Sequence, residues 1–263
     1  MNGKKCVAFV RKLTERECFR LMGVDEGVID AIDKTGICKT AKYHLAGNSI
    51  VVDVLYHLFK SAFIDNDGKS EFTIEHPLRV STLCSGYDAQ FLALDRLQRD
   101  FSEFRYERVW YAEHDPESKK PDSEQPAVIV HEALFPNCPN LGDITKVDWK
   151  DVHDRYGDID LMFYSTPCQS ISQSGLSHGF IEGSGTRSSI IWNVRDAIDA
   201  IRPRFACLEN VSAMLNKKFR PTFDLWCEAV SSFGYSNFFK VLNARDYGVP
   251  QNRLRVFMFS INK

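Results

Sequence analysis

The sequence lacks a hydrophobic run long enough to span a membrane, and its N-terminus lacks the charged, apolar and small-residue pattern of a signal peptide. Its eight cysteines include no C-x-x-C pair and no companion histidine at zinc-finger spacing, which argues against both a metal site and a disulfide scaffold. Internal repeats and low-complexity segments are also absent. We therefore expect a soluble, cytoplasmic protein with reduced thiols, no metal and no membrane partner.

Strong charge of one sign is missing as well, because the net charge is only −2 at pH 7. A chain that coats nucleic acid unaided carries a large basic excess, so binding to DNA or RNA would need a local basic groove or another polypeptide. The chain has 263 residues, of which 44% are hydrophobic. This is enough to bury one large core, and we expect a single structural domain.

Hydrophobic periodicity divides the chain into two unequal parts, joined by a polar linker at 65–77. The first part contains a short amphipathic helix over 13–22, where Thr14 and Glu17 have capping-box spacing. A mostly apolar run over 50–63 predicts a buried helix, with Asn48 or Ser49 as its cap.

From residue 79 onward, short apolar runs alternate with helical patterns. Strands are expected at 79–83, 107–113, 159–164, 204–209, 236–243 and 254–260, and helices near 88–100, 124–134, 187–201 and 221–233. This alternation predicts an α/β fold with a doubly wound, mostly parallel sheet covered on both faces. No helix is predicted between the last two strands, so we expect them to form an antiparallel hairpin at one edge.

A cysteine follows the strand predicted at 159–164. The sequence Ser165-Thr166-Pro167-Cys168-Gln169 leads from this buried strand into a segment rich in Gly and Ser, and open α/β sheets place their sites at such strand ends. A lone cysteine in this position is more often a buried structural thiol. Residues at the other strand ends favour a functional role here.

Two neighbouring strand ends have features of an adenosine-type cofactor site. Gly86 lies in the turn after the first strand, where it lets a ligand approach the backbone, and Glu113 closes the second strand, where its oxygens can accept from ribose hydroxyls. Asp143 supplies an acid at the next strand end, suited to an adenine amino group. A tight turn and solvated acids are the alternative interpretation.

Charged residues also end the later strands. Glu209 closes an apolar strand, and a carboxylate there is either paired or functional, because burial without a partner is costly. Arg253 and Arg255 point to one face of the last strand at a period of two. They suit a polar ring oxygen and a phosphate, or form a plain solvated edge.

Taken together, four motifs resemble those of the cytosine carbon-5 DNA methyltransferases: Pro167-Cys168-Gln169, Glu209-Asn210-Val211, Gln251-x-Arg253-x-Arg255 and Gly47-Asn48-Ser49. The match covers nearly the whole chain. It implies a class I, Rossmann-like methyltransferase fold, S-adenosylmethionine as methyl donor, and DNA as partner, with the target cytosine flipped out of its duplex.

The resemblance also implies a role for each motif. Cys168 would add as a thiolate to carbon 6 of cytosine, and Glu209 would bind ring nitrogen 3 and the exocyclic amine. Arg255 would contact the carbonyl oxygen of the base, and Arg253 would hold Cys168 and the base in place. Ser172 and Gln251 would contact the nucleic acid. The cofactor would contact Cys84, Gly86, Glu113, Asp143, Pro167, Asn48 and Ser49.

One departure from the family pattern lies in the cofactor turn, where Asp88 replaces the second glycine and Cys84 replaces a phenylalanine. We expect Asp88 to cap the following helix, in a position where its side chain would crowd the methionine part of the cofactor.

A second departure is the order of the motifs, because the segments resembling 11–23 and 47–49 usually come last. We therefore expect a circularly permuted chain: residues 1–64 complete the cofactor pocket, 65–77 are a linker, and 78–263 are the catalytic core. No segment resembles a target recognition domain, so a separate recognition subunit or a relaxed sequence preference is expected. An RNA cytosine methyltransferase and a catalytically weak subunit of a split methyltransferase are the alternatives. A restriction-modification role is one of several that stay open.

Overall fold

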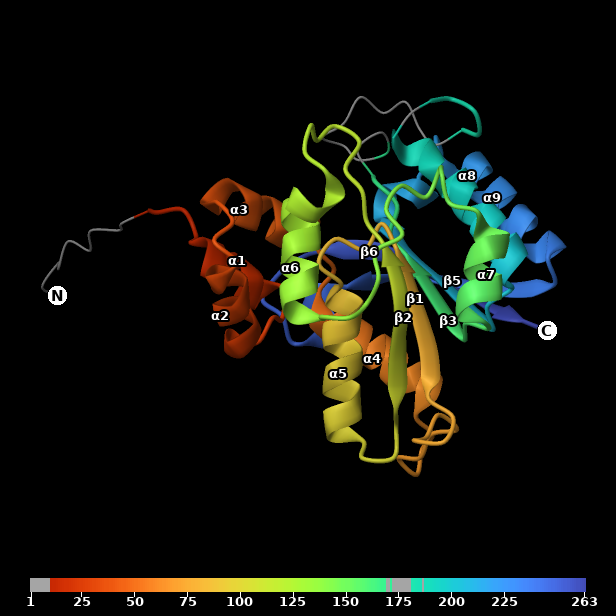
Figure 1. The fold of residues 1–263 in the computed structure, drawn as a ribbon, viewed down its shortest axis with the longest axis horizontal. Coiled ribbons are helices and arrows are strands. Elements are labelled where there is room, and N and C mark those ends of the chain that lie inside the picture. The colour runs from red at the N-terminus through yellow and green to blue at the C-terminus, as the bar shows by residue number, and fades with distance from the viewer. Residues whose placement is uncertain (1–9, 169–170, 172–180, 186) are drawn as a thin grey trace, which may run out of the picture.

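The computed structural model describes residues 10–168, 171, 181–185 and 187–263, and all structural statements below refer to these residues (Figure 1). A single six-stranded sheet has the order β2-β1-β3-β4-β6-β5. The strands are β1 (Leu78–Leu83), β2 (Tyr106–Ala112), β3 (Leu161–Tyr164), β4 (Phe205–Val211), β5 (Tyr235–Asn243) and β6 (Leu254–Asn262). β1 to β4 pair in parallel, whereas β6 pairs antiparallel with both β4 and β5. The predicted α/β sheet and its antiparallel edge hairpin are confirmed.

Nine α-helices are described along these residues. They are α1 (Glu15–Leu21), α2 (Glu26–Lys34), α3 (Lys39–Asn48), α4 (Val52–Phe63), α5 (Ala89–Asp100), α6 (Pro126–Leu134), α7 (Trp149–Tyr156), α8 (Ile191–Ile201) and α9 (Arg220–Ser232). None of these helices combines the length and the apolar composition needed to cross a bilayer. The sequence patterns did not predict α2, α3 or α7.

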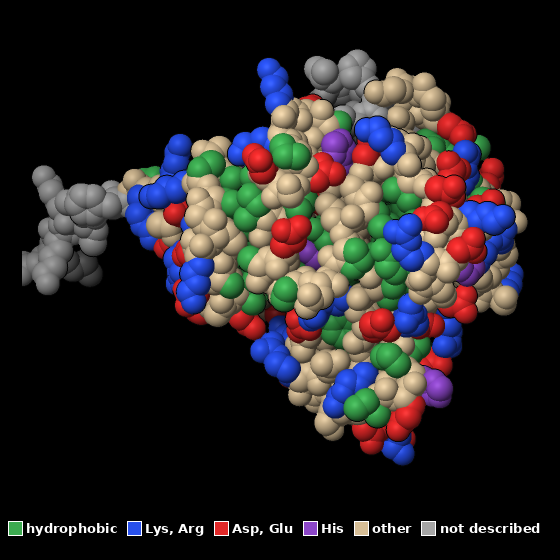
Figure 2. All heavy atoms as spheres, in the orientation of Figure 1, with side chains coloured by type: hydrophobic (Ala, Val, Ile, Leu, Met, Phe, Trp, Pro, Cys, Tyr) green, Lys and Arg blue, Asp and Glu red, His purple; other side chains and the backbone are tan. Residues whose placement is uncertain are grey.

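Side-chain alternation along the strands builds two hydrophobic clusters, one on each face of the sheet. In β3, Leu161 and Phe163 join the cluster formed with α1 to α6, while Met162 and Tyr164 join the cluster formed with α7, α8 and α9. Figure 1 shows the two groups of helices on opposite sides of the sheet. On the face drawn in Figure 2, acidic and basic side chains are interspersed, in keeping with the small net charge.

The first helix has the predicted capping box. The backbone N–H of Glu17 donates to Thr14 Oγ1 (3.3 Å), and the backbone N–H of Thr14 donates to Glu17 Oε2 (2.8 Å). The predicted cap of the helix at 50–63 is wrong. α4 begins at Val52 after a cap residue, Val51, that has no side-chain hydrogen bond, because Asn48 still belongs to α3 and the Ser49 hydroxyl is used elsewhere.

The polar segment 65–77 contains neither helix nor strand, as predicted, but it is tied to the core. Phe72 within it is buried, and its carbonyl accepts from the backbone N–H of Arg105 (3.0 Å). Phe63 at the end of α4 packs edge-on against Phe72 and Phe205, with ring centroids 5.7 and 5.6 Å apart. Phe63 therefore joins the N-terminal helices, the polar segment and the sheet in one aromatic cluster.

We expect Phe63→Ala to lower the free energy of unfolding by about 3–5 kcal/mol, because it leaves a cavity at the junction of these three parts. The loss should appear in one cooperative transition, measured by urea unfolding followed by circular dichroism and by tryptophan fluorescence. Phe238→Ala is the matched control, since the Phe238 side chain is 60% exposed. Separate transitions for the two probes, or equal effects of both substitutions, would contradict a shared core.

Candidate active site

Strand direction gathers the predicted site residues at one edge of the sheet. The carboxyl ends of β1, β2, β3 and β4 meet there because these strands are parallel. β6 runs antiparallel to β4, so its first residues lie at the same edge, with Arg255 opposite Val211. Residues far apart in the sequence are thereby brought together.

A buried ion pair lies at this edge. Glu209 is 7% exposed, and its Oε1 lies 3.1 Å from Arg255 Nε. Burial raises the pKa of the Glu209 carboxyl, and the charges of Arg255 and Arg253 oppose this rise. Burial and the charge of Glu209 likewise raise the pKa of the Cys168 thiol, while Arg255 and Arg253 lower it. The four predicted groups therefore lie within electrostatic range of one another.

The loop that carries Cys168 is held by neighbours that the sequence patterns did not single out. Asn210 Nδ2 donates to the carbonyl of Thr166 (3.1 Å), and the Ser165 hydroxyl donates to the carbonyl of Cys84 (3.0 Å). Asn210 is buried in β4 next to Glu209. Its position inside the Glu209-Asn210-Val211 motif was the available signal. The side chain fixes the backbone just before Pro167 and Cys168.

Arg253 joins the last strand to the N-terminal helices. Its Nη2 donates to the carbonyls of Gly47 (3.0 Å) and Ser49 (2.7 Å), at the end of α3, where helix carbonyls lack partners within the helix. Burial, together with repulsion from Arg255, lowers the pKa of Arg253 to about 10. Gln251 also faces this segment, since its Nε2 lies 3.9 Å from Met22 Sδ. In this structure both side chains contact the N-terminal part.

The turn after β1 leaves open space beside its backbone. Gly86 has a φ of +60°, and a Cβ added there would meet nothing within 4 Å, so its backbone faces open space. The Gly86 N–H donates to Glu113 Oε2 (2.8 Å). Burial raises the pKa of Glu113 to about 7, against the effect of this hydrogen bond. A half-buried turn with open space beside Gly86 and a carboxylate acceptor next to it fits a ligand with adjacent hydroxyls.

The N-terminal segment reaches this turn directly. The Ser49 hydroxyl donates to the Tyr87 hydroxyl (2.8 Å), and the Phe19 ring packs edge-on against Tyr87 with centroids 5.7 Å apart. Asn48, the last residue of α3, is exposed next to Ser49. Two predicted cofactor residues therefore lie beside the predicted cofactor turn, although they precede it by more than thirty residues in the sequence.

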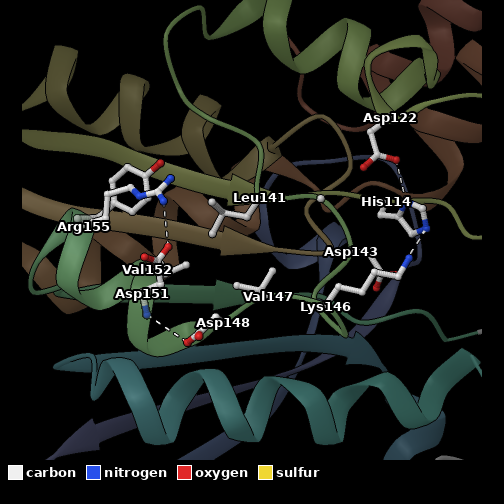
Figure 3. Close-up of a pocket in the computed structure, with 12 residues that line it drawn as sticks. His114, Asp122, Leu141, Asp143, Lys146, Val147, Asp148, Asp151, Val152 and Arg155 are labelled. Atoms are coloured by element: carbon white, nitrogen blue, oxygen red, sulfur yellow. Dashed lines mark hydrogen bonds and ion pairs between the residues drawn. The ribbon is translucent and has the colours of Figure 1, made fainter.

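Asp143 lines a pocket of about 380 Å³ between the loops after β2 and α6 and helix α7 (Figure 3). Burial alone would raise its pKa, but Lys146 Nζ at 2.9 Å and hydrogen bonds from Thr145 lower the pKa of Asp143 to about 2. His114, which follows Glu113, lies 2.7 Å from Asp122 through Nδ1. The pocket lining includes neither Cys168 nor Glu209, so the pocket is separate from the Glu209–Arg255 pair.

Asp88 behaves differently from the prediction. It occupies the cap position of α5, but with left-handed backbone angles (φ 59°, ψ 63°) and without a side-chain cap bond. Its carboxylate is fully buried, accepts from the Thr82 hydroxyl (3.1 Å) and lies 3.0 Å from His131 Nε2. The side chain therefore points into the protein, and the expected crowding of the cofactor has no basis in this geometry.

Two further predictions concern a phosphate contact and a metal site. Ser172, the predicted phosphate contact, lies outside the described residues. Within the described part of the chain, no group of three or more His, Cys, Asp or Glu side chains is arranged to hold a metal ion.

Solved structures with this fold are methyltransferases. A putative DNA modification methyltransferase from an Escherichia coli prophage aligns with 70% of this chain and 47% of its own, at 21% identity and a TM-score of 0.53. The Schizosaccharomyces pombe Dnmt2 methyltransferase aligns with 70% of this chain and 49% of its own, at 19% identity and a TM-score of 0.51. This chain therefore shares its fold with these two methyltransferases.

Sequence comparison identifies the family. The model of the C-5 cytosine-specific DNA methylases matches residues 4–63 and 78–263, and the chain belongs to this family. Type II methyltransferase M2.ScrFI of Lactococcus lactis subsp. cremoris is 41% identical over 122 residues, covering 46% of this chain and 33% of its own. Orphan methyltransferase M.Rho11sI of Bacillus phage rho11s is 30% identical over 186 residues, covering 71% of this chain and 33% of its own. The chain spans about a third of the length of these relatives.

The raised pKa of the half-buried Glu113 gives a prediction about stability. Its pKa is raised from 4.5 to about 7, so the native state binds this proton more tightly than the unfolded state, and stability falls as pH rises through this window. Glu113→Gln cannot ionise and keeps the acceptor for the Gly86 N–H. We expect it to be more stable than the unsubstituted chain at about pH 8, by at most about 3 kcal/mol.

Urea unfolding without cofactor, at about pH 5 and about pH 8, measures this difference. Glu107→Gln is the matched control, because Glu107 lies in β2, which ends just before Glu113, and forms an exposed ion pair with Arg79. That variant should keep the pH dependence of the unsubstituted chain. An unchanged pH dependence in Glu113→Gln would show that Glu113 is not responsible.

Proposed function

We propose that this chain transfers a methyl group from S-adenosylmethionine to carbon 5 of cytosine in DNA. The observation that carries the proposal is the buried Glu209–Arg255 pair beside Cys168, at the edge that also holds the Gly86 turn. Membership of the C-5 cytosine-specific DNA methylase family supports the same reaction. The names of the relatives, type II and orphan methyltransferases, support a role in DNA modification.

Cys168 would act as the nucleophile. Its thiol loses a proton, and the thiolate adds to carbon 6 of the flipped cytosine, which moves electron density onto carbon 5. Burial disfavours the thiolate, and the cations Arg253 and Arg255 are the groups that favour it. After methyl transfer, loss of the carbon-5 proton expels the Cys168 sulfur and restores the aromatic ring.

Glu209 would act as the acid that makes this addition possible. Because burial raises its pKa, the carboxyl can carry a proton and donate it to ring nitrogen 3 as the thiolate adds. Arg255 keeps the Glu209 side chain oriented through their 3.1 Å contact and would present its remaining N–H groups to the carbonyl oxygen of the base. We assign Arg253 to holding the N-terminal segment against this site.

S-adenosylmethionine, when bound, supplies an electrophilic methyl group. The Gly86 turn would admit the ligand, and Glu113 would accept hydrogen bonds from its ribose. Asp143 would face the adenine amino group, in exchange for its contact with Lys146. The remaining proposed contacts are Cys84, Pro167, Asn48 and Ser49.

We also propose the permuted arrangement: residues 1–64 complete the cofactor pocket, 65–77 link, and 78–263 form the catalytic core. The family match supports it, because the matched blocks, 4–63 and 78–263, leave the linker unmatched. The contacts of Ser49 with Tyr87 and Arg253 support it as well.

Target recognition, in this proposal, comes from a separate polypeptide or is replaced by a relaxed sequence preference. All six described strands belong to the catalytic sheet, so none builds a second lobe, and base readout would need further residues. A cytoplasmic location is also part of the proposal, since six described cysteines (Cys18, Cys38, Cys138, Cys168, Cys207 and Cys227) are free thiols and suit a reducing compartment.

The test is transfer of labelled methyl to unmethylated duplex DNA, with mapping of the modified base. We expect Cys168→Ala to abolish transfer and Glu209→Gln to slow it by about 10²- to 10⁴-fold, because the first loses the nucleophile and the second the acid. Both variants should still bind S-adenosylmethionine.

Cys38→Ala is the matched control, because Cys38 is an exposed thiol far along the chain from the site, and it should leave transfer unchanged. Undiminished methylation by Cys168→Ala would exclude this nucleophile. Transfer to tRNA but not to duplex DNA would replace the proposed substrate with RNA.

A further inference from the structure

A buried acid–histidine pair lies behind the cofactor turn and takes no part in the mechanism above. Asp88, at the end of the turn, and His131, in α6, are both fully buried. His131 Nε2 lies 3.0 Å from Asp88 Oδ2, which also accepts from the Thr82 hydroxyl at 3.1 Å. The pair therefore connects the turn after β1 with a helix that follows β2.

His131 is held rigidly in its place. The Tyr111 ring stacks on it, with centroids 3.5 Å apart and planes at 19°. Phe91 and Phe135 pack against its edges, with centroids 6.0 and 5.3 Å away. Enclosed by three rings, the imidazole has one orientation toward Asp88, and the carboxylate is the polar group that it meets there.

The Asp88–His131 pair is not well suited to stabilising the folded protein. Asp88 adopts a left-handed backbone conformation (φ 59°) that glycine adopts without strain. Asp88 Oδ1 and both ring nitrogens of His131 are buried without a hydrogen bond among the described residues, so the 3.0 Å approach of Nε2 to Asp88 lacks hydrogen-bond geometry. A glycine facing an apolar side chain would avoid both costs, since buried charged pairs rarely stabilise more than well-packed apolar groups. An effect on the turn explains the pair better than an effect on overall stability.

The geometry of the turn shows what the pair can control. The Asp88 N–H donates to the Ser85 carbonyl (3.0 Å), which closes the turn around Gly86. On the opposite side, the Gly86 N–H donates to Glu113 (2.8 Å). The turn is thus held from β2 through Glu113 and from α6 through His131, and displacement of Asp88 would move the backbone that faces the ligand.

We propose that Asp88 and His131 form a positioning pair for the cofactor: His131 anchors Asp88, and Asp88 holds the 84–88 turn in the bend that presents Gly86 and Glu113 to S-adenosylmethionine. The inference rests on the proposed function, because it takes the turn as the cofactor site. In this chain, position 88 holds an aspartate that His131 keeps in place. A glycine at this position would adopt the same backbone bend without such a contact.

His131→Phe tests the pair, because it keeps an aromatic ring between Tyr111 and Phe135 but removes the imidazole nitrogen that lies 3.0 Å from the buried Asp88 carboxylate. We expect S-adenosylmethionine to bind about 10- to 100-fold more weakly, as for the loss of one buried polar partner. The kcat at saturating cofactor should stay within about twofold, because no reacting group changes. Adding Asp88→Gly to His131→Phe removes the unpaired carboxylate and should restore most of the lost affinity.

Calorimetric titration with S-adenosylmethionine, at a temperature where the melting curves show every variant folded, separates binding from stability. His153→Phe is the matched control: His153 lies 3.4 Å from Asp158, before the amino end of β3 and away from the turn. It should bind the cofactor like the unsubstituted chain. Should His131→Phe not fold, Asp88→Ala and Asp88→Asn replace it, with weak binding expected for Ala and rescue for Asn, which tolerates the left-handed bend.

Variants that melt earlier but bind S-adenosylmethionine as tightly as the unsubstituted chain would overturn the inference and leave the pair a structural one. Equal losses in His131→Phe and in the double variant would overturn the coupling between the two residues. No binding by the unsubstituted chain would instead overturn the proposed cofactor, and this assignment with it.

Discussion

The antiparallel pairing of β6 with β4 is the constraint on which the rest of the site depends. It places the first residues of β6 at the edge where the parallel strands finish, and so sets Arg255 beside Glu209. Arg253, just before β6, binds the free carbonyls at the end of α3. The start of this strand thereby positions the ion pair and holds the N-terminal helices against the sheet.

Contacts, rather than chain order, hold this arrangement together. Phe63 joins the aromatic cluster of the sheet, and Ser49 reaches Tyr87, although both belong to the segment before the polar linker. The packing of a core does not depend on where the chain begins, provided that the chain ends and the connecting segments lie at the surface. Burial raises the pKa values of Glu113, Glu209 and Cys168. Arg253 and Arg255 oppose this rise at Glu209 and Cys168.

The sequence allowed the strands to be predicted, because each is a short apolar run that alternates with a helical pattern. The polar helices α2 and α3 were missed, since their stability comes from tertiary packing, whereas α7 had a readable signal in Asp148, which caps it. Cys168, Glu209 and Gly86 could be selected because each ends or follows a predicted strand. The contacts that hold the surrounding loops could not be predicted. Asn210 with Thr166, and Asp88 with His131, are long-range pairs that no local sequence pattern indicates. The left-handed backbone of Asp88 also invalidated its expected cap.

The most direct measurement of the central claim is to trap the bond between Cys168 and the base. Duplex DNA in which fluorine replaces the carbon-5 hydrogen of cytosine blocks the final loss of a proton, so the adduct persists after methyl transfer. Incubation of the chain with this DNA and S-adenosylmethionine, together with any recognition polypeptide that it requires, should give a covalent species by mass spectrometry. Peptide mapping should locate the bond at Cys168. An adduct at another residue, or methylated cytosine formed without any adduct, would contradict the account.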